Sequence, residues 1–329
     1  MLKKPKSINA LMSYLRTHHG IAIKGSLHKR KLQNIGYYHG FKGYRYNRVP
    51  NNIIPYTDFN QILAINKFDM SLKAMFYPEI MFVETALKNH ALAIVLKAGK
   101  TYNFNDIFNN LLVGYQKYPV QSGKYINAMQ RRLEFRTKLY GTLTSAYKNK
   151  KKVITHFYHK NDNVPIWAIF ETINLGEFGT FIYCLKHSLK VELSKTLRLN
   201  QSCDTNAELT QSMIYIVKDL RNAIAHNEII FDTRFKNTDI GPNVIRCLEI
   251  DVGVSSIKFE NIVDYLILIA YLLKNLKVSK KEILKMISLF EEATETLRKE
   301  IPINMYMSIL PTDTKKKLTL LRAFVKKQK

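Results

Sequence analysis

Residues 206–232, NAELTQSMIYIVKDLRNAIAHNEIIFD, combine a strong helical pattern with a group of polar side chains suited to phosphate chemistry. At about 100° per residue, one arc of the helix is apolar throughout, at Met213, Ile216, Val217, Leu220 and Ile224. The opposite side carries Tyr215, Lys218, Asn222 and His226, with Arg221 at the border between the two. The pattern predicts an amphipathic helix that buries the apolar arc and presents a cation, an amide and an imidazole away from it.

Arg221, Asn222 and His226 are the candidate catalytic residues. Metal-independent RNA cleavage needs a group that accepts the 2′-hydroxyl proton, a group that protonates the leaving 5′-oxygen, and positive charge on the phosphorane. Histidine transfers protons near neutral pH, and arginine offers a permanent bidentate charge to phosphate oxygens. Asn222 would orient the substrate or His226. The plainer alternative is a solvated polar face, because an arginine and a histidine at this spacing are weak evidence alone.

Four stretches together resemble one protein family. RNAIAHNEIIFD (221–232) resembles the signature of AbiD/AbiF-type abortive-infection proteins, which belong to the HEPN superfamily. LQNIGYYHGFKGYRY (32–46) resembles the glycine-tyrosine motif of these proteins, and VPIWAIFETINLGEFGTFIY (164–183) resembles their PxW segment. INKFDMSLKAMFYPEIMFVETALKNHAL (65–92) resembles their FD helices, with Lys73 where arginine is usual. The four blocks occur in family order.

The resemblance implies a fold, an activity and partners. The fold would be an all-α, HEPN-like helical bundle with additional N-terminal helices. The activity would be anti-phage defence by a metal-independent endoribonuclease, with no cofactor and with two facing motifs that make a homodimer necessary. Its products would carry a 2′,3′-cyclic phosphate and a 5′-hydroxyl, and a small noncoding RNA would be a partner. The alternative is a catalytically inactive RNA-binding protein in a defence or toxin-antitoxin ribonucleoprotein.

The charge of the chain favours a polyanionic partner. Its 329 residues include 51 Lys and Arg against 26 Asp and Glu, a net charge of +25, and 46% of them are apolar. Such a charge attracts nucleic acids, and no segment combines basic and bulky apolar faces as a membrane-surface helix does. The longest apolar run, Ile262 to Leu273, is too short to span a bilayer. Three cysteines far apart and no signal-peptide pattern predict a reduced, cytoplasmic setting.

Basic and aromatic side chains that could contact RNA occur in two regions and on the central helix. The RNA-binding candidates are Lys29, Arg30, Lys31, Tyr38, Arg45, Lys124, Arg131, Arg132, Arg136, Lys150, Lys151, Lys152 and Lys218. Cations would pair with phosphates and tyrosines would stack on unpaired bases. Alternatively, the tyrosines pack into the core and the basic segment is a solvated helix pair. His156 and His159 have metal-like spacing without a third ligand nearby, so no metal site is predicted.

The composition of the chain and the family resemblance together divide it into four regions. We expect an N-terminal helical region over 1–115, a basic helical segment over 116–163, a HEPN-like region over 164–300 and a basic C-terminal tail over 301–329. The last part of that tail is expected to fray.

Several local signals locate elements within these regions. Thr57 or Asp58 can cap a helix that ends before Pro78, and Pro78 suits the first turn of a second helix. Glu84 lies near the apolar stripe of that second helix, where a carboxylate more often makes a hydrogen bond or an ion pair than performs chemistry. Trp167, in an apolar segment, is expected to anchor the core.

Two more signals concern the C-terminal half. Residues 229–252 predict a loop or a short β-hairpin with a turn at Gly241 and Pro242. Ser279 and Glu282 form a capping box that opens another helix.

Overall fold

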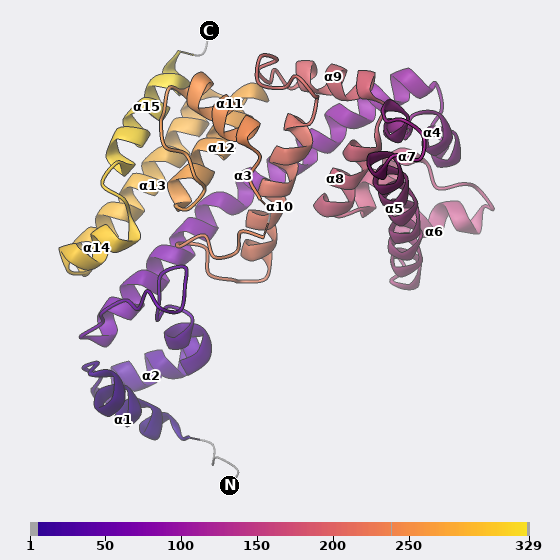
Figure 1. Cartoon of the computed structure of the whole chain (residues 1–329). Helices are drawn as coiled ribbons and strands as arrows, with labels where there is room; N and C mark the ends of the chain where they lie inside the picture. The colour runs from indigo at the N-terminus through magenta and orange to yellow at the C-terminus, as the bar shows by residue number, and fades with distance from the viewer. Residues whose placement is uncertain (1–5, 238, 328–329) are drawn as a thin grey trace.

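The computed structural model describes residues 6–237 and 239–327, and within them the chain is all-α, as predicted (Figure 1). The helices, in order, are α1 (Ile8–His19), α2 (Gly25–Ile35), the π-helix η1 (Gly36–Lys42), α3 (Phe59–Gly99), α4 (Phe104–Asn110), the 3₁₀ helix η2 (Gly114–Lys117), α5 (Gly123–Lys148), α6 (Lys152–His159), α7 (Ile166–Thr172), α8 (Leu175–Cys184), α9 (His187–Thr196), α10 (Leu209–Ala225), α11 (Pro242–Val252), α12 (Ile262–Asn275), α13 (Lys280–Glu300), α14 (Ile303–Ile309) and α15 (Thr314–Lys326).

Helix α3 is the spine of the molecule. Its 41 residues begin at a capping box made by Asp58 and Gln61 and run diagonally through the fold (Figure 1). The prediction of two helices separated at Pro78 is wrong, because α3 continues through that proline. A proline inside a helix costs roughly 3 kcal/mol. Buried side chains on either side of it, such as Phe76 and Ile80, offset that cost by holding both halves in one line against the neighbouring helices.

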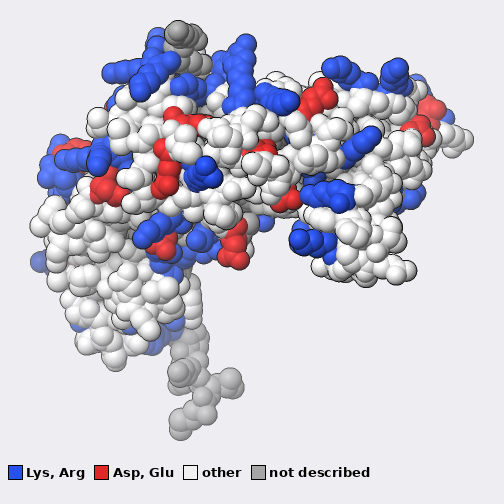
Figure 2. All heavy atoms as spheres, turned by 45° about the horizontal axis from the view of Figure 1, so that its top comes forward, with Lys and Arg blue, Asp and Glu red and all other residues white. Residues whose placement is uncertain are grey.

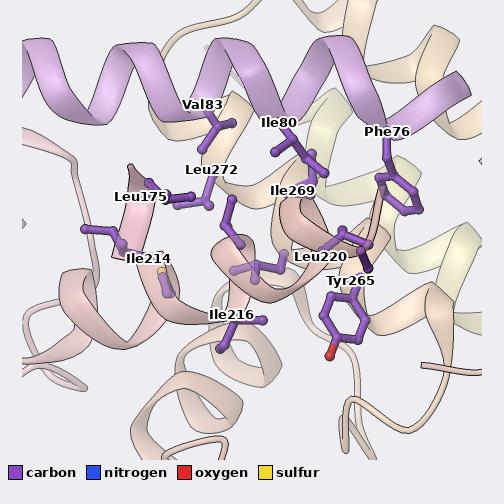
Figure 3. Close-up of a cluster of buried hydrophobic side chains, with 14 of the residues drawn as sticks. Phe76, Ile80, Val83, Leu175, Ile214, Ile216, Leu220, Tyr265, Ile269 and Leu272 are labelled. Atoms are coloured by element: carbon purple, nitrogen blue, oxygen red, sulfur yellow. The ribbon is translucent and has the colours of Figure 1, made fainter. Parts of the chain in front are cut away.

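The core fills the space between α3 and the helices that cross it. Phe76, Ile80 and Val83 point from α3 toward Ile269 of α12 and Leu220 of α10 (Figure 3). Helix α3 also packs against α13, α9 and α7. One hydrophobic cluster therefore includes side chains from all four regions expected from the sequence, and α10 lies within it.

The apolar run from Ile262 to Leu273 is the most deeply buried segment of the core. Every residue in it is buried within α12. This explains its composition, because a helix that is apolar all round needs partners on all sides. Among the described residues, no helix combines the length and the apolar character needed to cross a membrane.

The prediction of a β-hairpin within 229–252 is wrong. The described part of the segment runs irregularly as far as Gly241 and then forms α11, which has Pro242 in its first turn and ends at Gly253 in the left-handed conformation. Proline in the first helical turn loses no hydrogen bond, and glycine accepts positive φ without strain. The Gly-Pro pair therefore starts a helix here.

The C-terminal part packs against α12 and α13. Leu321 and Val325 of α15 are fully buried, and the Lys317 ammonium lies 2.8 Å from the Asp264 carboxylate inside the core. The prediction that this end frays is therefore wrong for residues 314–326. The capping box of Ser279 and Glu282 at the start of α13 is confirmed.

Candidate functional site

Helix α10 has the two faces that its sequence predicted. Met213, Ile216, Val217 and Leu220 are buried, and Ile224 packs against the core from its edge. Tyr215, Lys218 and Asn222 are half-buried and His226 is exposed. Asp219 is buried as well, where its carboxylate lies 2.8 Å from the Lys218 ammonium. The buried face thus anchors α10 in the core, and its polar C-terminal end faces outward.

Arg221 is held by a buried carboxylate of the spine. Its Nε lies 3.4 Å from Glu84 Oε2, and its Nη1 donates to Asn222 Oδ1 at 3.2 Å. Glu84 Oε1 accepts a hydrogen bond of 2.9 Å from Lys88, which also donates to the carbonyl of Ile173 at 2.8 Å. The ion pair expected of Glu84 is confirmed, and one of its partners is the candidate catalytic arginine. This contact fixes where the guanidinium lies.

His226 is the C-cap residue of α10, directly after Ala225. Its backbone N–H donates to the carbonyl of Asn222 at 2.9 Å, and the next residue, Asn227, has a positive φ of 55°. His226 lies five positions after Arg221, which is about 7.5 Å along a helix axis at 1.5 Å per residue. The exposed imidazole and the half-buried guanidinium therefore share one end of one helix.

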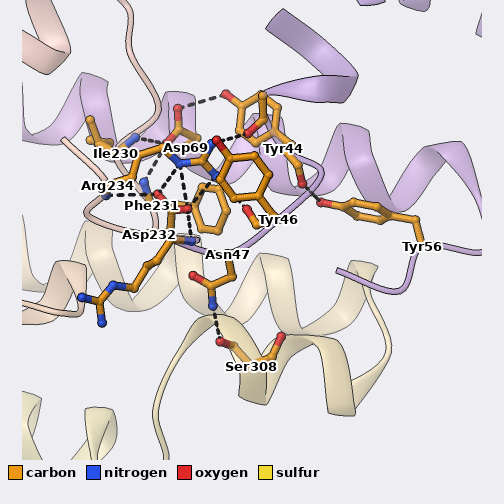
Figure 4. Close-up of polar contacts among 12 residues, drawn as sticks. Tyr44, Tyr46, Asn47, Tyr56, Asp69, Ile230, Phe231, Asp232, Arg234 and Ser308 are labelled. Atoms are coloured by element: carbon orange, nitrogen blue, oxygen red, sulfur yellow. Dashed lines mark hydrogen bonds and ion pairs between the residues drawn. The ribbon is translucent and has the colours of Figure 1, made fainter. Parts of the chain in front are cut away.

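A buried network fixes the chain directly after His226 (Figure 4). Asp69 of α3 accepts hydrogen bonds of 2.8 Å from the backbone N–H groups of Ile230 and Phe231. Its second oxygen lies 2.8 Å from the Lys73 ammonium, and that ammonium donates to Asn227 Oδ1 at 2.9 Å. Asp69 is fully buried and Lys73 nearly so. Asp69 and Lys73 of α3 thus fix the position of the chain where α10 ends.

The glycine-tyrosine motif belongs to the same network. The Tyr44 hydroxyl donates to Asp69 at 3.0 Å, and burial raises the pKa of that hydroxyl well above its usual value, so it stays a donor. Arg234 pairs with Asp232 and donates to the carbonyls of Gly43 and Tyr46 at 2.8 and 2.7 Å (Figure 4).

Gly43 is required by the close packing around this network. A Cβ atom at Gly43 would lie 2.5 Å from the carbonyl oxygen of His39 and 2.7 Å from Cδ1 of Ile229. Sequence reasoning did not identify Asp69, Asp232 or Arg234 as part of the site. The signal that could have identified Asp69 is its position on the buried stripe of α3.

Trp167 does not anchor the core, and that prediction is wrong. Its side chain is 43% exposed and contacts Phe157 edge to face, with ring centres 5.4 Å apart. The short helix α7 buries Ile166, Ala168, Ile169 and Phe170, and this face leaves the intervening position outside. Trp167 and Arg221 line the same surface hollow, of about 560 Å³.

The RNA-binding candidates fall on separated surfaces. Lys29, Arg30 and Lys31 lie on α2 and Tyr38 on η1, far from the candidates on α5 and α6 (Figure 1). Tyr38 is 75% exposed, and Arg45 is half-buried in the segment after η1. Lysine and arginine are spread along much of the face in Figure 2 and do not form one compact patch.

On α5 and α6 the candidates differ in how free they are. Lys124, Arg131, Lys150, Lys151 and Lys152 are exposed. The guanidinium of Arg132 donates to the carbonyls of Leu112 and Phe108 at 2.7 and 2.8 Å, and that of Arg136 donates to Asn105 at 3.3 Å. Arg132 and Arg136 thus tie α5 to α4 and the segment after it.

Clusters of metal-binding side chains and reactive thiols are the two other features that could add chemistry to the site. The described residues contain no cluster of three or more His, Cys, Asp or Glu able to hold a metal ion. Cys184, Cys203 and Cys247 are free and buried. Burial raises the pKa of Cys184 and of Cys247 to about 12, so neither thiol is activated as a nucleophile.

Comparison with known proteins places the chain in a family. The model of the Abi-like protein family matches residues 30–232, which is more than half of the chain. The match begins in α2 and ends at Asp232, so it covers the glycine-tyrosine motif, the spine, Trp167 and α10. No curated protein and no solved structure matches the chain. The chain belongs to the Abi-like protein family of abortive-infection proteins.

Proposed function

We propose that this protein is a metal-independent HEPN-type endoribonuclease that cleaves RNA during abortive infection, using Arg221, Asn222 and His226. The observation that carries the proposal is that an arginine held by a buried carboxylate and an exposed histidine share one end of α10. Family membership connects the chain with abortive-infection defence. The cleavage reaction and the RNA substrate are the parts that we propose in addition to family membership.

The roles of the two side chains follow from their exposure. The exposed His226 can reach a ribose hydroxyl or a leaving oxygen and transfer a proton. Arg221, with a side chain 29% exposed, can turn its outer nitrogens toward a phosphate while Glu84 keeps its inner nitrogen in place. Preorganised charge of this kind stabilises a phosphorane more than a mobile charge does. Asn222 accepts from Arg221 and orients it.

One copy of the motif supplies one histidine, whereas the reaction needs an acid and a base. A homodimer that brings two α10 ends together would supply both. In this arrangement Arg30 of α2 and the exposed cations of α5 and α6 would hold a small noncoding RNA or the RNA substrate. The same RNA could hold the enzyme in check until infection.

A second function is favoured by one observation. The carboxylate of Glu84 partly neutralises the Arg221 guanidinium and leaves it fewer free donors for a reacting phosphate. An RNA-binding protein without nuclease activity, in a defence or toxin-antitoxin ribonucleoprotein, would need no more than this.

The test compares RNA ends in infected cells that carry the wild type, His226→Ala or His187→Ala. His187 is a matched control because it is exposed at the start of another helix, α9. We expect His226→Ala to reduce new 5′-hydroxyl ends by roughly 100-fold or more, the usual contribution of a proton-transfer group, and His187→Ala to leave them unchanged. EDTA should not reduce cleavage by the purified protein.

RNA that co-purifies with the protein separates the two functions. If both variants retain RNA and wild-type cells form no new ends during infection, the ribonuclease proposal is wrong and the RNA-binding function takes its place.

A further inference from the structure

The hollow beside Arg221 is built from three helices and two connecting segments. Helices α3, α7 and α10, together with the residues before α6 and α8, enclose about 560 Å³. We call it the Arg221 hollow. Its polar and aromatic lining includes Glu84, Lys88, Lys151, Trp167, Asn174 and Arg221. A space of this size and chemistry can accept one nucleotide.

Trp167 offers an aromatic surface to this hollow. The side chain is 43% exposed, although an exposed tryptophan loses the benefit of burial. Its ring also lines a second hollow, with Lys152, His156 and His159 of α6, so it lies between the two. The contact with Phe157, at an interplanar angle of 73°, touches the indole edge to face and holds it in position. An aromatic ring fixed in this way is typical of a base-stacking platform.

Glu84 and Arg221 form the charged inner wall of the hollow. Glu84 Oε2 and Arg221 Nε are buried, and neither has a hydrogen bond of good geometry among the described residues, although they face each other at 3.4 Å. Glu84 is 94% buried and lines the hollow. Because these two atoms are shielded from solvent and face each other, they hold the inner side of the Arg221 guanidinium, and its outer nitrogens are the ones that can meet a ligand.

The charges of the hollow favour a phosphate on one side. Lys88 is already paired with Glu84, whereas the exposed Lys151 is in no ion pair with a described residue. The exposed carboxylate of Glu171 also lines the hollow and would repel a phosphate placed beside it. The phosphate is therefore expected between Lys151 and Arg221, with the base toward Trp167.

We propose that the Arg221 hollow binds an unpaired nucleotide next to the phosphate that Arg221 contacts, with its base stacked on Trp167, so that the RNA taken is single-stranded. Bases inside a duplex are stacked on both faces and cannot reach a side-chain ring. Aromatic stacking is tolerant of base identity, so the hollow selects unpaired RNA more than a sequence. This inference rests on the proposed function in one respect, which is that the phosphate at Arg221 is the one that is cleaved. Binding of the nucleotide itself requires no cleavage.

The chain provides a direct probe, because Trp167 is its single tryptophan. Its fluorescence is followed while a short single-stranded RNA, methylated at every 2′-oxygen so that it cannot be cleaved, is added to the full-length protein. The same RNA annealed to its complement and inorganic polyphosphate serve as comparisons. We expect the single strand to quench the fluorescence, and the duplex and polyphosphate to bind with little quenching. Equal quenching by all three, or none by the single strand, would overturn the inference.

Variants locate the effect. Trp167→Ala is expected to weaken binding of the single strand roughly 5- to 100-fold, the range found when a stacking ring is removed, and Trp167→Phe to weaken it less. Tyr102→Ala is the matched control, because Tyr102 is 67% exposed and is not part of the hollow. Unchanged binding by Trp167→Ala would also overturn the inference.

Cleavage assays keep this inference separate from the proposed function. If quenching occurs but no cleavage is found, the hollow is confirmed and the ribonuclease proposal fails. If cleavage occurs without quenching, the ribonuclease proposal is supported and the inference about the Arg221 hollow fails.

Discussion

Lys190 of helix α9 is only 4% exposed, and its ammonium lies 5.0 Å from the ring centre of Tyr183. Desolvation, and after it the nearby charge of Lys117, lower the pKa of this ammonium to about 8. Between about pH 8 and the usual lysine value of about 10.4, the unfolded chain keeps this proton and the folded chain loses it. The contribution of Lys190 to stability therefore rises with pH in that window and is lowest below it.

We predict that Lys190→Met stabilises the protein by roughly 2 kcal/mol near neutral pH, because it removes a buried charge. The gain should shrink as pH rises from about 8 to about 10. The pKa values of the buried thiols of Cys184 and Cys247 are raised, so these groups lower the stability as pH rises. Both the wild type and Lys190→Met contain these thiols, so their contribution cancels in the difference in stability between the two proteins. Urea unfolding at several pH values measures it, with the exposed Lys186→Met as control. A gain that does not change with pH would contradict the assignment.

At the scale of single elements, the sequence predicts those whose pattern is local. The apolar arc of α10 and the capping box of α13 both appear in the structure, because helix period and capping depend on residues a few positions apart. The continuity of α3 through Pro78 and the exposure of Trp167 depend on which helices cover them, and no local pattern contains that information.

The candidate site divides in the same way. Arg221, Asn222 and His226 could be chosen from spacing and resemblance. The residues that hold these three in place could not be chosen in this way. Asp69 contacts Ile230, which lies 161 positions later in the sequence, and Glu84 contacts Arg221 from another helix. Long-range contacts of this kind are set by tertiary packing.

The end of α10 and the loop after it should depend on Asp69 more than on any residue of the loop. We predict that Asp69→Asn destabilises the protein by about 3 to 5 kcal/mol, because it leaves the buried Lys73 ammonium without its carboxylate. Amide exchange at residues 227–231 should rise with the loss of the Asp69 hydrogen bonds. Asp106→Asn is the control, since that carboxylate is exposed and accepts one side-chain hydrogen bond. Equal stability of the two variants would show that the network does not hold the loop.

At the scale of the whole molecule, α3 joins two separate ends of the fold into one body. Helices α1 and α2 lie at one end and α5 and α6 at the other, with α10 between them (Figure 1). Exposed cations occur at both ends, and the net charge is +25. An RNA that reaches His226 from either direction would therefore pass cations before it meets the site.

RNA binding should accordingly depend steeply on salt. If a single strand contacts about five phosphates, each contributing about 0.7 to the logarithmic slope, raising the salt from about 50 to about 200 mM should weaken binding roughly 100-fold. Fluorescence anisotropy with the uncleavable RNA and His226→Ala measures the slope. Adding Lys151→Ala to that protein should reduce the slope by about 0.7, because one phosphate contact is lost, while adding Lys195→Ala, an exposed lysine of α9, should not. A slope near zero would mean that the net charge of the chain has no role in holding RNA, and an unchanged slope with Lys151→Ala would remove the phosphate from the side of the Arg221 hollow where we place it.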